Sequence, residues 1–467
     1  MSILKDVKNL KIAYIGGASR GWARTLMTDL AKEPDIAGTV SMYDIDFEGA
    51  KDNAMVGNRV SARADVVGKW KYEAVQTIGE ALTGADFVVL SIQPGTFDEM
   101  EVDVHLPEKY GIYQSVGDTV GPGGVVRSLR TIPIYVEFAE AIKKYCPEAW
   151  VINFTNPMTV CVRTLYKVFP EIKAFGCCHE VFGTQKMFAG LLLDQCGLKV
   201  DREEIKFNVL GINHFTWVDE AKYKGVDLFP LLEKAIEEHP EGMRHFDQNW
   251  ANKTFKNSYL VLADLFKRFG IVPAAGDRHL AEFVPGKWYL KDPETVEKFG
   301  FTLTTVDYRK KKLEEKNALT KRLANGEEEM VFRDTGEESV RQIKALLGMG
   351  DFITNVNIPN RGQMEGLPVD AVVETNAYFS GNSIRPVYAG RLPNEVETYV
   401  DRVVHNQETV VEAGIEGDYE LAFKAFVNDA NMPLPLKEAR ELYDEMLEKT
   451  SKYLPAYDKY VAGRKDK

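Results

Sequence analysis

The fold is decided by the stretch Leu10-Lys11-Ile12-Ala13-Tyr14-Ile15-Gly16-Gly17-Ala18-Ser19-Arg20-Gly21. Its first six residues form an apolar run typical of a buried β-strand, and a glycine-rich turn follows directly. Gly16, Ala18 and Gly21 occupy the three small-residue positions of the G-x-G-x-x-G fingerprint. Small residues let the backbone approach a pyrophosphate, which the free N–H groups of a following helix attract. We therefore expect a dinucleotide to bind along the whole turn, from Gly16 to Gly21.

The segment after the turn supports the same prediction. Residues 22–32 carry apolar side chains at helical spacing, and residues 40–43 form a second strand-like run. Asp44 follows this run, at the distance from the turn where a carboxylate accepts hydrogen bonds from ribose hydroxyls. A carboxylate there would repel the 2′-phosphate of NADP, so the spacing favours NAD. Because strand, turn, helix and distal acid agree, we favour a bound dinucleotide over a glycine turn without a ligand.

Strand-like and helix-like patterns alternate through the first half of the chain, which is typical of a parallel α/β sheet. Strands are expected over residues 87–91, 150–153 and 207–211, and helices over 127–144, over the strongly charged, exposed stretch 308–338, and in three stretches after residue 393. The expected fold class is α/β. A Rossmann-type parallel sheet is predicted in residues 1–200, and a mixed α+β C-terminal lobe in residues 201–467, without a linker between them.

The composition narrows the class of partners. The chain has 467 residues and a net charge of −12, which disfavours nucleic acid or an anionic membrane, because both are bound by clustered Lys and Arg. Residues 1–6 lack the apolar stretch of a signal peptide, and no apolar run is long enough to span a bilayer. The five cysteines are few and odd in number, unlike a disulfide framework. We expect a cytoplasmic protein that binds neither nucleic acid nor membranes.

Three segments place polar side chains directly after apolar runs, where open α/β sheets collect functional groups. They are Thr155-Asn156-Pro157, Gly176-Cys177-Cys178-His179-Glu180 and Asn213-His214. A thiolate and an imidazole together suit a transition metal, so we interpret Cys178 and His214 as metal ligands. A buried thiol and hydrogen-bonded core histidines are the alternative, and the spacing does not decide between the two.

Two acids follow glycine residues. Asp118 lies in the glycine-rich segment 117–124, and Asp277 follows Gly276. Aspartate in such a loop is commonly a turn former or a helix cap. The sequence leaves this alternative open for both acids.

Taken together, these segments resemble the NAD- and manganese-dependent glycoside hydrolases of family 4, a family outside the usual two-carboxylate mechanism. The resemblance covers the Gly16 turn, residues 117–124, Thr155-Asn156-Pro157, the Cys178 segment and Asn213-His214, and continues through residues 357–362, 367–368 and 373–375. So many motifs in the same order identify the chain as similar to this family over most of its length. The resemblance implies NAD and Mn²⁺, or another divalent metal, as cofactors.

The same resemblance points to a substrate class. Cys178-His179-Glu180-Val181 is similar to the members that act on α-galacturonides. Phospho-glycosidases of the family carry an arginine where our alignment places Met100, which argues against a 6-phospho sugar. Asp277 stands where some members have a tyrosine, as in the non-phosphorylated α-glycoside members. α-Galactosidase and α-glucuronidase activity are the alternatives within the family.

The resemblance also implies a mechanism in which hydrolysis passes through a transient oxidation. NAD removes hydride from C3 of the sugar, Asp277 removes the C2 proton, the leaving group departs from C1, water adds, and the hydride returns. His179 is the first candidate for the acid that assists departure, and Asp118 is the alternative. Cys178 and His214 would hold the metal, with open positions for substrate and water.

The remaining expectations concern the sugar acid and assembly. Asn156 is expected to hydrogen-bond a sugar hydroxyl, and Arg278, His279 or Lys287 to bind the uronate carboxylate. The family resemblance implies a homodimer or homotetramer. Outside the family, the alternatives are a 2-hydroxy-acid dehydrogenase, which shares the Rossmann start, and a redox-sensing protein that holds NAD without turnover.

Overall fold

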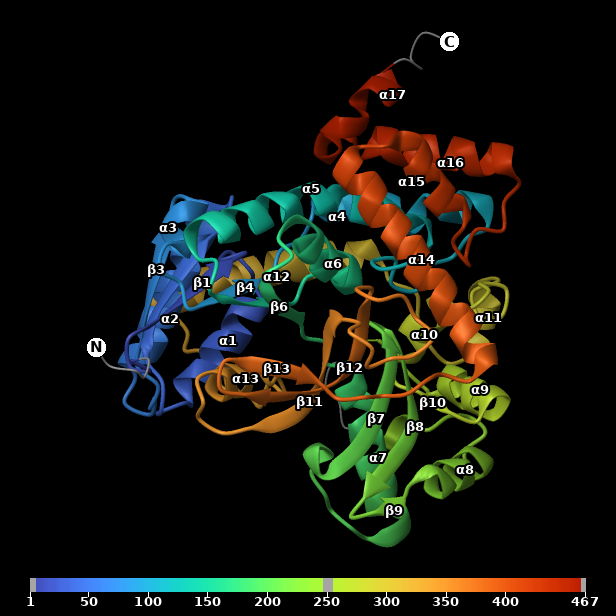
Figure 1. Ribbon diagram of the computed structural model, residues 1–467, viewed down its shortest axis with the longest axis horizontal. Coiled ribbons are helices and arrows are strands. Elements are labelled where there is room, and N and C mark those ends of the chain that lie inside the picture. The colour runs from blue at the N-terminus through green and yellow to red at the C-terminus, as the bar shows by residue number, and fades with distance from the viewer. Residues whose placement is uncertain (1–5, 247–254, 463–467) are drawn as a thin grey trace.

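The structure, a computed structural model, describes residues 6–246 and 255–462. A nine-stranded sheet lies at its centre, in the order β13-β12-β11-β6-β5-β4-β1-β2-β3 (Figure 1). The strands from β3 to β6 run parallel, and their order β3-β2-β1-β4-β5-β6 is that of a Rossmann dinucleotide-binding sheet. Their bounds are β1 Leu10–Ile15, β2 Gly38–Tyr43, β3 Trp70–Val75, β4 Phe87–Leu90, β5 Trp150–Asn153 and β6 Lys173–Gly176.

Three strands from the second half of the chain extend this sheet. β11 (Phe352–Pro359) pairs antiparallel with β6, and β12 (Val372–Ser380) and β13 (Ser383–Pro386) continue the antiparallel edge. Asn357 of β11 pairs with Gly176 of β6. The sheet register therefore brings residues near 176, 357 and 374 into one neighbourhood.

A second, antiparallel sheet lies below the first in Figure 1. It consists of β7 (Ile205–Ile212), β8 (Phe215–Tyr223), β9 (Val226–Asp227) and β10 (Val272–Pro273). Asn213 and His214 form the turn between β7 and β8. Apolar side chains of this sheet and of the helices around it form a large buried core, which fixes the position of the turn.

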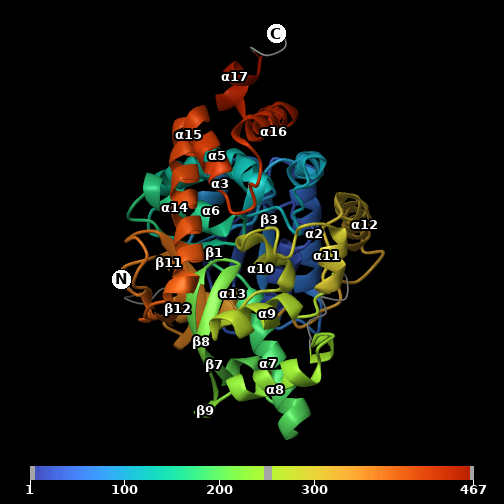
Figure 2. The same cartoon turned by 90° about the vertical axis from the view of Figure 1, so that its right-hand side faces the viewer.

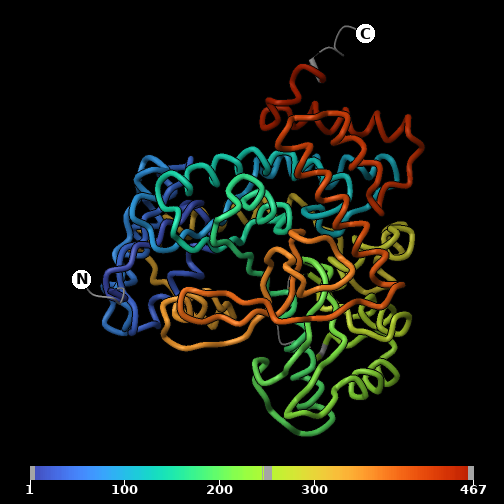
Figure 3. The backbone as a smooth tube through the Cα atoms, viewed as in Figure 1, coloured from blue at the N-terminus to red at the C-terminus, as the bar shows by residue number. Residues whose placement is uncertain are grey.

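Helices cover both sheets, and α14 links the two parts of the molecule. The first half of this helix packs into the core around the second sheet (Figure 2). Its second half packs with α5 (Gly121–Tyr145), α15 (Tyr419–Val427) and α16 (Leu436–Lys449) (Figure 3). α12 contacts α2 and α4 beside the parallel strands. No helix in residues 6–246 or 255–462 is long and apolar enough to cross a membrane. The helices are α1 Trp22–Ala31, α2 Phe47–Ala62, α3 Ile78–Leu82, α4 Phe97–His105, α5 Gly121–Tyr145, α6 Met158–Val168, α7 Glu180–Cys196, α8 Phe229–Glu238, α9 Leu260–Phe269, α10 Asp277–Phe283, α11 Pro293–Lys298, α12 Val306–Asn325, α13 Ser339–Leu346, α14 Asn394–Glu416, α15 Tyr419–Val427, α16 Leu436–Lys449 and α17 Asp458–Ala462.

The α/β fold class with its Rossmann-type sheet is confirmed, and two helix boundaries differ from the prediction. α5 begins at Gly121, not at residue 127, because the glycine-rich loop itself turns into the helix. The charged helix ends at Asn325, not at residue 338, because Gly326 adopts a left-handed φ of 76° that closes its C-terminus. α12 is also less exposed than predicted, since Val306, Leu323 and Ala324 are buried.

Candidate active site

The glycine-rich turn packs tightly against the ends of two strands. Gly16 has a φ of 103°, and a Cβ there would lie 2.0 Å from the carbonyl oxygen of Ser91. The backbone N–H groups of Gly16 and Gly17 donate to the carbonyl of Tyr43 at 2.9 and 2.8 Å. The turn after β1 therefore contacts the ends of β2 and β4, at the point where the strand order reverses and where doubly wound sheets bind their ligands.

The predicted cofactor residues meet at the carboxyl end of β2. Asp44 accepts a hydrogen bond from the N–H of Ala18 at 2.9 Å. Arg20 forms an ion pair of 2.7 Å with Asp46, which lies two residues after Asp44. Asn53 of α2 donates to the carbonyls on both sides of Ala18, at 2.8 and 2.9 Å. The turn is thus held in shape by protein groups, with Asp44 still partly exposed beside it.

α12 supplies one further cation, Lys316, to this turn. Arg20 donates from Nε to the side chain of Asn317 at 2.7 Å. The ammonium nitrogen of Lys316 lies 3.7 Å from the position that a Cβ on Gly21 would take. Burial, and then the neighbouring Arg24, lower the pKa of Lys316. Two crowded cations beside a helix N-terminus fit a bound pyrophosphate.

Three potential metal ligands converge next to Asn156, which follows β5. Asp118, His214 and His279 each offer one ligand atom, and these atoms lie within 4.8 Å of one another. His214 has a left-handed φ of 65° at the β7–β8 turn, and its ring lies 3.9 Å from that of His279. Burial, and then His279, lower the pKa of His214 to about 3. Its imidazole is therefore neutral, as a metal ligand must be.

Cys178, a predicted metal ligand, is buried just after β6 and is not one of the three residues of this cluster. Burial, and then the nearby Glu374 and Glu180, raise the pKa of its thiol well above the ordinary value, while the side chain of Asn213 opposes that rise. Glu374 accepts hydrogen bonds from Asn213 at 3.2 Å and from Asn355 at 2.7 Å. The Cys178 thiol thus shares its surroundings with the turn that carries His214. A coordinated cation would favour the thiolate over the thiol.

Asp118 is held in its ionised form. Burial alone would raise the pKa of its carboxyl, but the positive charges of His214 and His279, where protonated, and of Arg127 hold that pKa well below its usual value. The carboxylate accepts hydrogen bonds from Thr119 at 2.7 Å and from the amide of Asn156 at 3.3 Å. Asp118 and Asn156, both predicted as site residues, therefore contact each other.

Asp277 begins α10 and is completely buried. Its two carboxylate oxygens accept hydrogen bonds from the backbone N–H groups of Leu260 and Leu262, at 2.9 and 3.0 Å, at the start of α9. Burial, the largest influence, raises the pKa of Asp277 to about 7. Asp277 therefore caps the start of α9, which is the structural alternative that the sequence left open.

His179 precedes α7 and is the most exposed of the predicted site residues around the metal cluster. Its side chain is 40% exposed, and Nδ1 lies 3.5 Å from Oε1 of Glu337. Glu180, next in sequence, accepts a hydrogen bond from the N–H of Gly276 at 2.8 Å and lies 3.6 Å from Nε2 of His279. His279, His179 and His214 outweigh burial and lower the pKa of Glu180 to about 2. Glu180 therefore orients the residues around Asp277, a function that its sequence position did not signal.

The candidates for the uronate carboxylate are not equally placed. Arg278 donates from Nε to the carbonyl of Thr302 at 2.9 Å and from Nη2 to that of Ser115 at 2.6 Å. Its guanidinium is therefore occupied by backbone oxygens. Lys287 is exposed, whereas His279 lies within the metal-type cluster.

The loop that carries Asp118 is held by two buried acids that sequence reasoning missed. Glu282 accepts hydrogen bonds from the N–H groups of Val116 and Gly117, at 2.7 and 2.9 Å. Asp429 accepts from the N–H of Gly121 at 2.9 Å. Both acids come from distant parts of the chain, and only the tertiary fold brings them to the loop.

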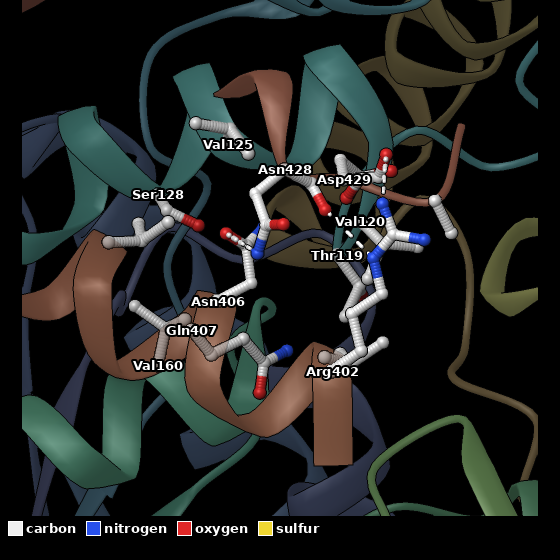
Figure 4. A pocket seen from close by; sticks show the side chains of 13 residues that line it. Thr119, Val120, Val125, Ser128, Val160, Arg402, Asn406, Gln407, Asn428 and Asp429 are labelled. Atoms are coloured by element: carbon white, nitrogen blue, oxygen red, sulfur yellow. Dashed lines mark hydrogen bonds between the residues drawn. The ribbon is translucent and has the colours of Figure 1, made fainter. Parts of the chain in front are cut away.

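A small cavity lies behind this loop, between α5, α6 and α14 (Figure 4). Thr119 and Val120 line one side, and both amide atoms of Gln407 are buried without a hydrogen-bond partner in the described part of the chain. Its volume of about 20 Å³ admits water and excludes a sugar. This cavity is therefore not the substrate site.

Sequence comparison agrees with this geometry. Residues 11–193 match the family 4 glycosyl hydrolases, and residues 209–432 match the family 4 glycosyl hydrolase C-terminal domain. The chain belongs to glycosyl hydrolase family 4. As the resemblance implied, the match extends across both sheets and includes the segments around Cys178 and His214.

Individual members of the family are similar over nearly their whole length. The α-galacturonidase of Thermoanaerobacterium saccharolyticum is 60% identical, over 97% of this chain and 98% of its own. The α-galacturonidase of Bacillus subtilis is 49% identical, over 95% and 98%. The crystal structure of LplD from Bacillus subtilis superposes with a TM-score of 0.90 at 49% identity, over 94% and 100%. A 6-phospho-α-glucosidase from gut microorganisms, solved with NAD and Mn²⁺, shares the fold at 20% identity and a TM-score of 0.77, over 96% and 99%.

Proposed function

We propose that this family 4 enzyme hydrolyses α-galacturonides with NAD and Mn²⁺ as cofactors. The carrying observation is that both parts of the site lie at the carboxyl ends of the parallel strands: the glycine-rich turn follows β1, and Asp118 of the cluster with His214 and His279 contacts Asn156, which follows β5. Similarity supports the substrate: four α-galacturonidases are 49–60% identical to this chain, whereas an α-galactosidase of Bacillus subtilis is 27% identical.

The residues present fit both cofactors. His279 Nδ1 and Asn156 Oδ1 are buried without a hydrogen-bond partner in the described residues, which suits a cation and a sugar hydroxyl. Cys178 and His214 are our metal ligands, with Asp118 and His279 in reach to complete the coordination. When bound, NAD would accept the C3 hydride and return it, and the cation would polarise the C3 ketone.

The chain's own residues divide the proton transfers. The pKa of Asp277, near 7, suits a base that removes the C2 proton at neutral pH. His179, whose Nδ1 lies 3.5 Å from Oε1 of Glu337 and whose side chain is 40% exposed, is our candidate for the acid at O1. Asp118 is held ionised, so we assign it to positioning Asn156 and the metal and not to proton donation.

Two further expectations, on the cellular location and on the oligomeric state, belong to the same proposal. The five cysteines carry no disulfide, which supports a reducing cytoplasmic location. We also propose a homodimer or homotetramer, on the family resemblance alone.

The test compares release of 4-nitrophenolate from the α-galacturonide and from the matching α-galactoside, with NAD, Mn²⁺ and a thiol reductant present. We expect cleavage of the galacturonide, no net accumulation of NADH, and loss of activity when either cofactor is withdrawn. Cleavage of the neutral galactoside alone would make the enzyme an α-galactosidase. Stoichiometric NADH formation would replace the hydrolase by a dehydrogenase.

A further inference from the structure

Arg309 on α12 is an anomaly among the cations around the crevice. Its Nε is buried without a hydrogen-bond partner, and no hydrogen bond or ion pair involves its guanidinium among the residues the structure describes. The arginines that share its electrostatic surroundings are occupied: Arg127 donates to the carbonyl of Asn156 at 3.2 Å, and Arg278 donates to backbone carbonyls. Arg309 as a whole is only partly buried, but a buried guanidinium nitrogen without a partner costs free energy unless a ligand completes it.

The position of Arg309 is fixed by the contacts of α12. Lys310 pairs with Asp98 of α4 at 2.7 Å, which anchors the first turns of the helix. Lys321 pairs with Asp52 of α2, also at 2.7 Å, near its end. Lys316 lies between them at the cofactor turn. Arg309 precedes Lys316 by seven residues, which is two helical turns or about 10 Å along one face. It therefore lies beyond the pyrophosphate position.

The charged groups that act on Arg309 show which part of the site it lies near. After burial, which lowers the pKa of its guanidinium, the largest influences are the opposing charge of Asp118 and the repulsion of Arg127. Conversely, Arg309 is the first charge, after burial, that lowers the pKa of Arg278, to about 10. Arg309 thus lies near the group that contains Asp118, where cations crowd one another and an additional anion would be stabilised.

We propose that Arg309 is the specificity residue that binds the C6 carboxylate of the sugar acid. The inference rests on the proposed function, which requires an anionic group at C6. A guanidinium presents two parallel N–H donors that match a carboxylate in a bidentate contact. The pyrophosphate of NAD is the other anion in the crevice, but Lys316 and the turn at residues 16–21 already surround its expected position.

The experiment compares three single variants of the full chain, each titrated calorimetrically with NAD and, in the presence of NAD and Mn²⁺, with D-galacturonate. Arg309→Ala should weaken galacturonate binding and kcat/KM for the nitrophenyl galacturonide by about 10- to 100-fold, the value of a hydrogen-bonded ion pair, while NAD affinity stays within about threefold. Lys316→Ala should instead weaken NAD. Lys312→Ala, on the same helix but paired with Glu315 at the surface, should alter neither.

The outcomes separate the two levels of the proposal. If wild type binds galacturonate and Arg309→Ala binds it equally well, the role of Arg309 is wrong while the substrate class stands. Weakened NAD binding with unchanged galacturonate binding would reassign Arg309 to the pyrophosphate and overturn the inference. If wild type binds NAD but no galacturonate, the proposed function itself fails. Should Arg309→Ala not fold, Arg309→Lys keeps the charge without the fork and should lose galacturonate affinity by about tenfold.

Discussion

Gly16 and Gly21 illustrate how residues of one motif differ in their physical role. Gly16 needs a positive φ and the absence of a side chain, since a Cβ would overlap the carbonyl of Ser91. A Cβ on Gly21 would meet nothing closer than 3.7 Å. We expect Gly16→Ala to lower the free energy of unfolding by about 2–4 kcal/mol without any cofactor present. Gly21→Ala is the matched control and should unfold within about 1 kcal/mol of wild type in the same urea titration; equal losses would contradict the distinction.

Asp277 combines a structural contact with the proposed proton transfer. Because both carboxylate oxygens accept backbone N–H groups, the amide of Asp277→Asn would turn its NH₂ toward one of those donors. We expect the variant to lose about 1–3 kcal/mol of stability and to abolish exchange of the substrate C2 proton with D₂O. Thermal unfolding and NMR measure the two effects separately. Exchange at the wild-type rate in a folded Asp277→Asn protein would place the base elsewhere.

The loop at residues 117–124 shows how an element can depend on a single buried group. Glu282 holds its start through two backbone N–H groups, yet Glu282 Oε2 has no partner among the described residues. Burial raises the pKa of Glu282 from 4.5 to about 8. The folded protein therefore binds this proton more tightly than the unfolded chain does. The resulting stability is complete below about pH 4 and is lost as the pH rises toward 8.

This linkage predicts the effect of Glu282→Gln, which keeps the acceptor and removes the titration. Wild type should lose at least about 1 kcal/mol more than the variant between pH 5 and pH 8. Urea unfolding at several pH values measures the difference. The exposed Glu171→Gln variant serves as the control and should follow wild type. Parallel curves for wild type and Glu282→Gln would mean that Glu282 is ionised throughout this range.

Across the whole molecule, short sequence patterns predicted the strands and turns that depend on neighbouring residues. The strands β1, β2, β4 and β5 and the turn at residues 16–21 follow from apolar runs and glycines, so the Rossmann sheet was predictable. The addition of β11–β13 to that sheet was not, because pairing over nearly two hundred residues leaves no local periodicity. Glu282 and Arg309 were also not predicted. Glu282 lies in α10, where no sequence pattern distinguishes it. Arg309 lies in a charged run that resembles a solvated surface.

The site itself joins the two halves of the chain, and this makes binding a test of the architecture. Cys178 and Asn156 follow strands of the first sheet, whereas His214 and His279 belong to the second sheet and its helices. A cation shared between them should stabilise the folded protein by mass action, about 2.7 kcal/mol at a hundred times its dissociation constant. We expect Mn²⁺ to raise the melting temperature of wild type and a chelator to reverse the rise. Cys178→Ser should lose most of the Mn²⁺-dependent rise but keep the rise produced by NAD, because the glycine-rich turn is intact. A full Mn²⁺ response in the serine variant would remove Cys178 from the metal site and leave Asp118, His214 and His279 as its ligands.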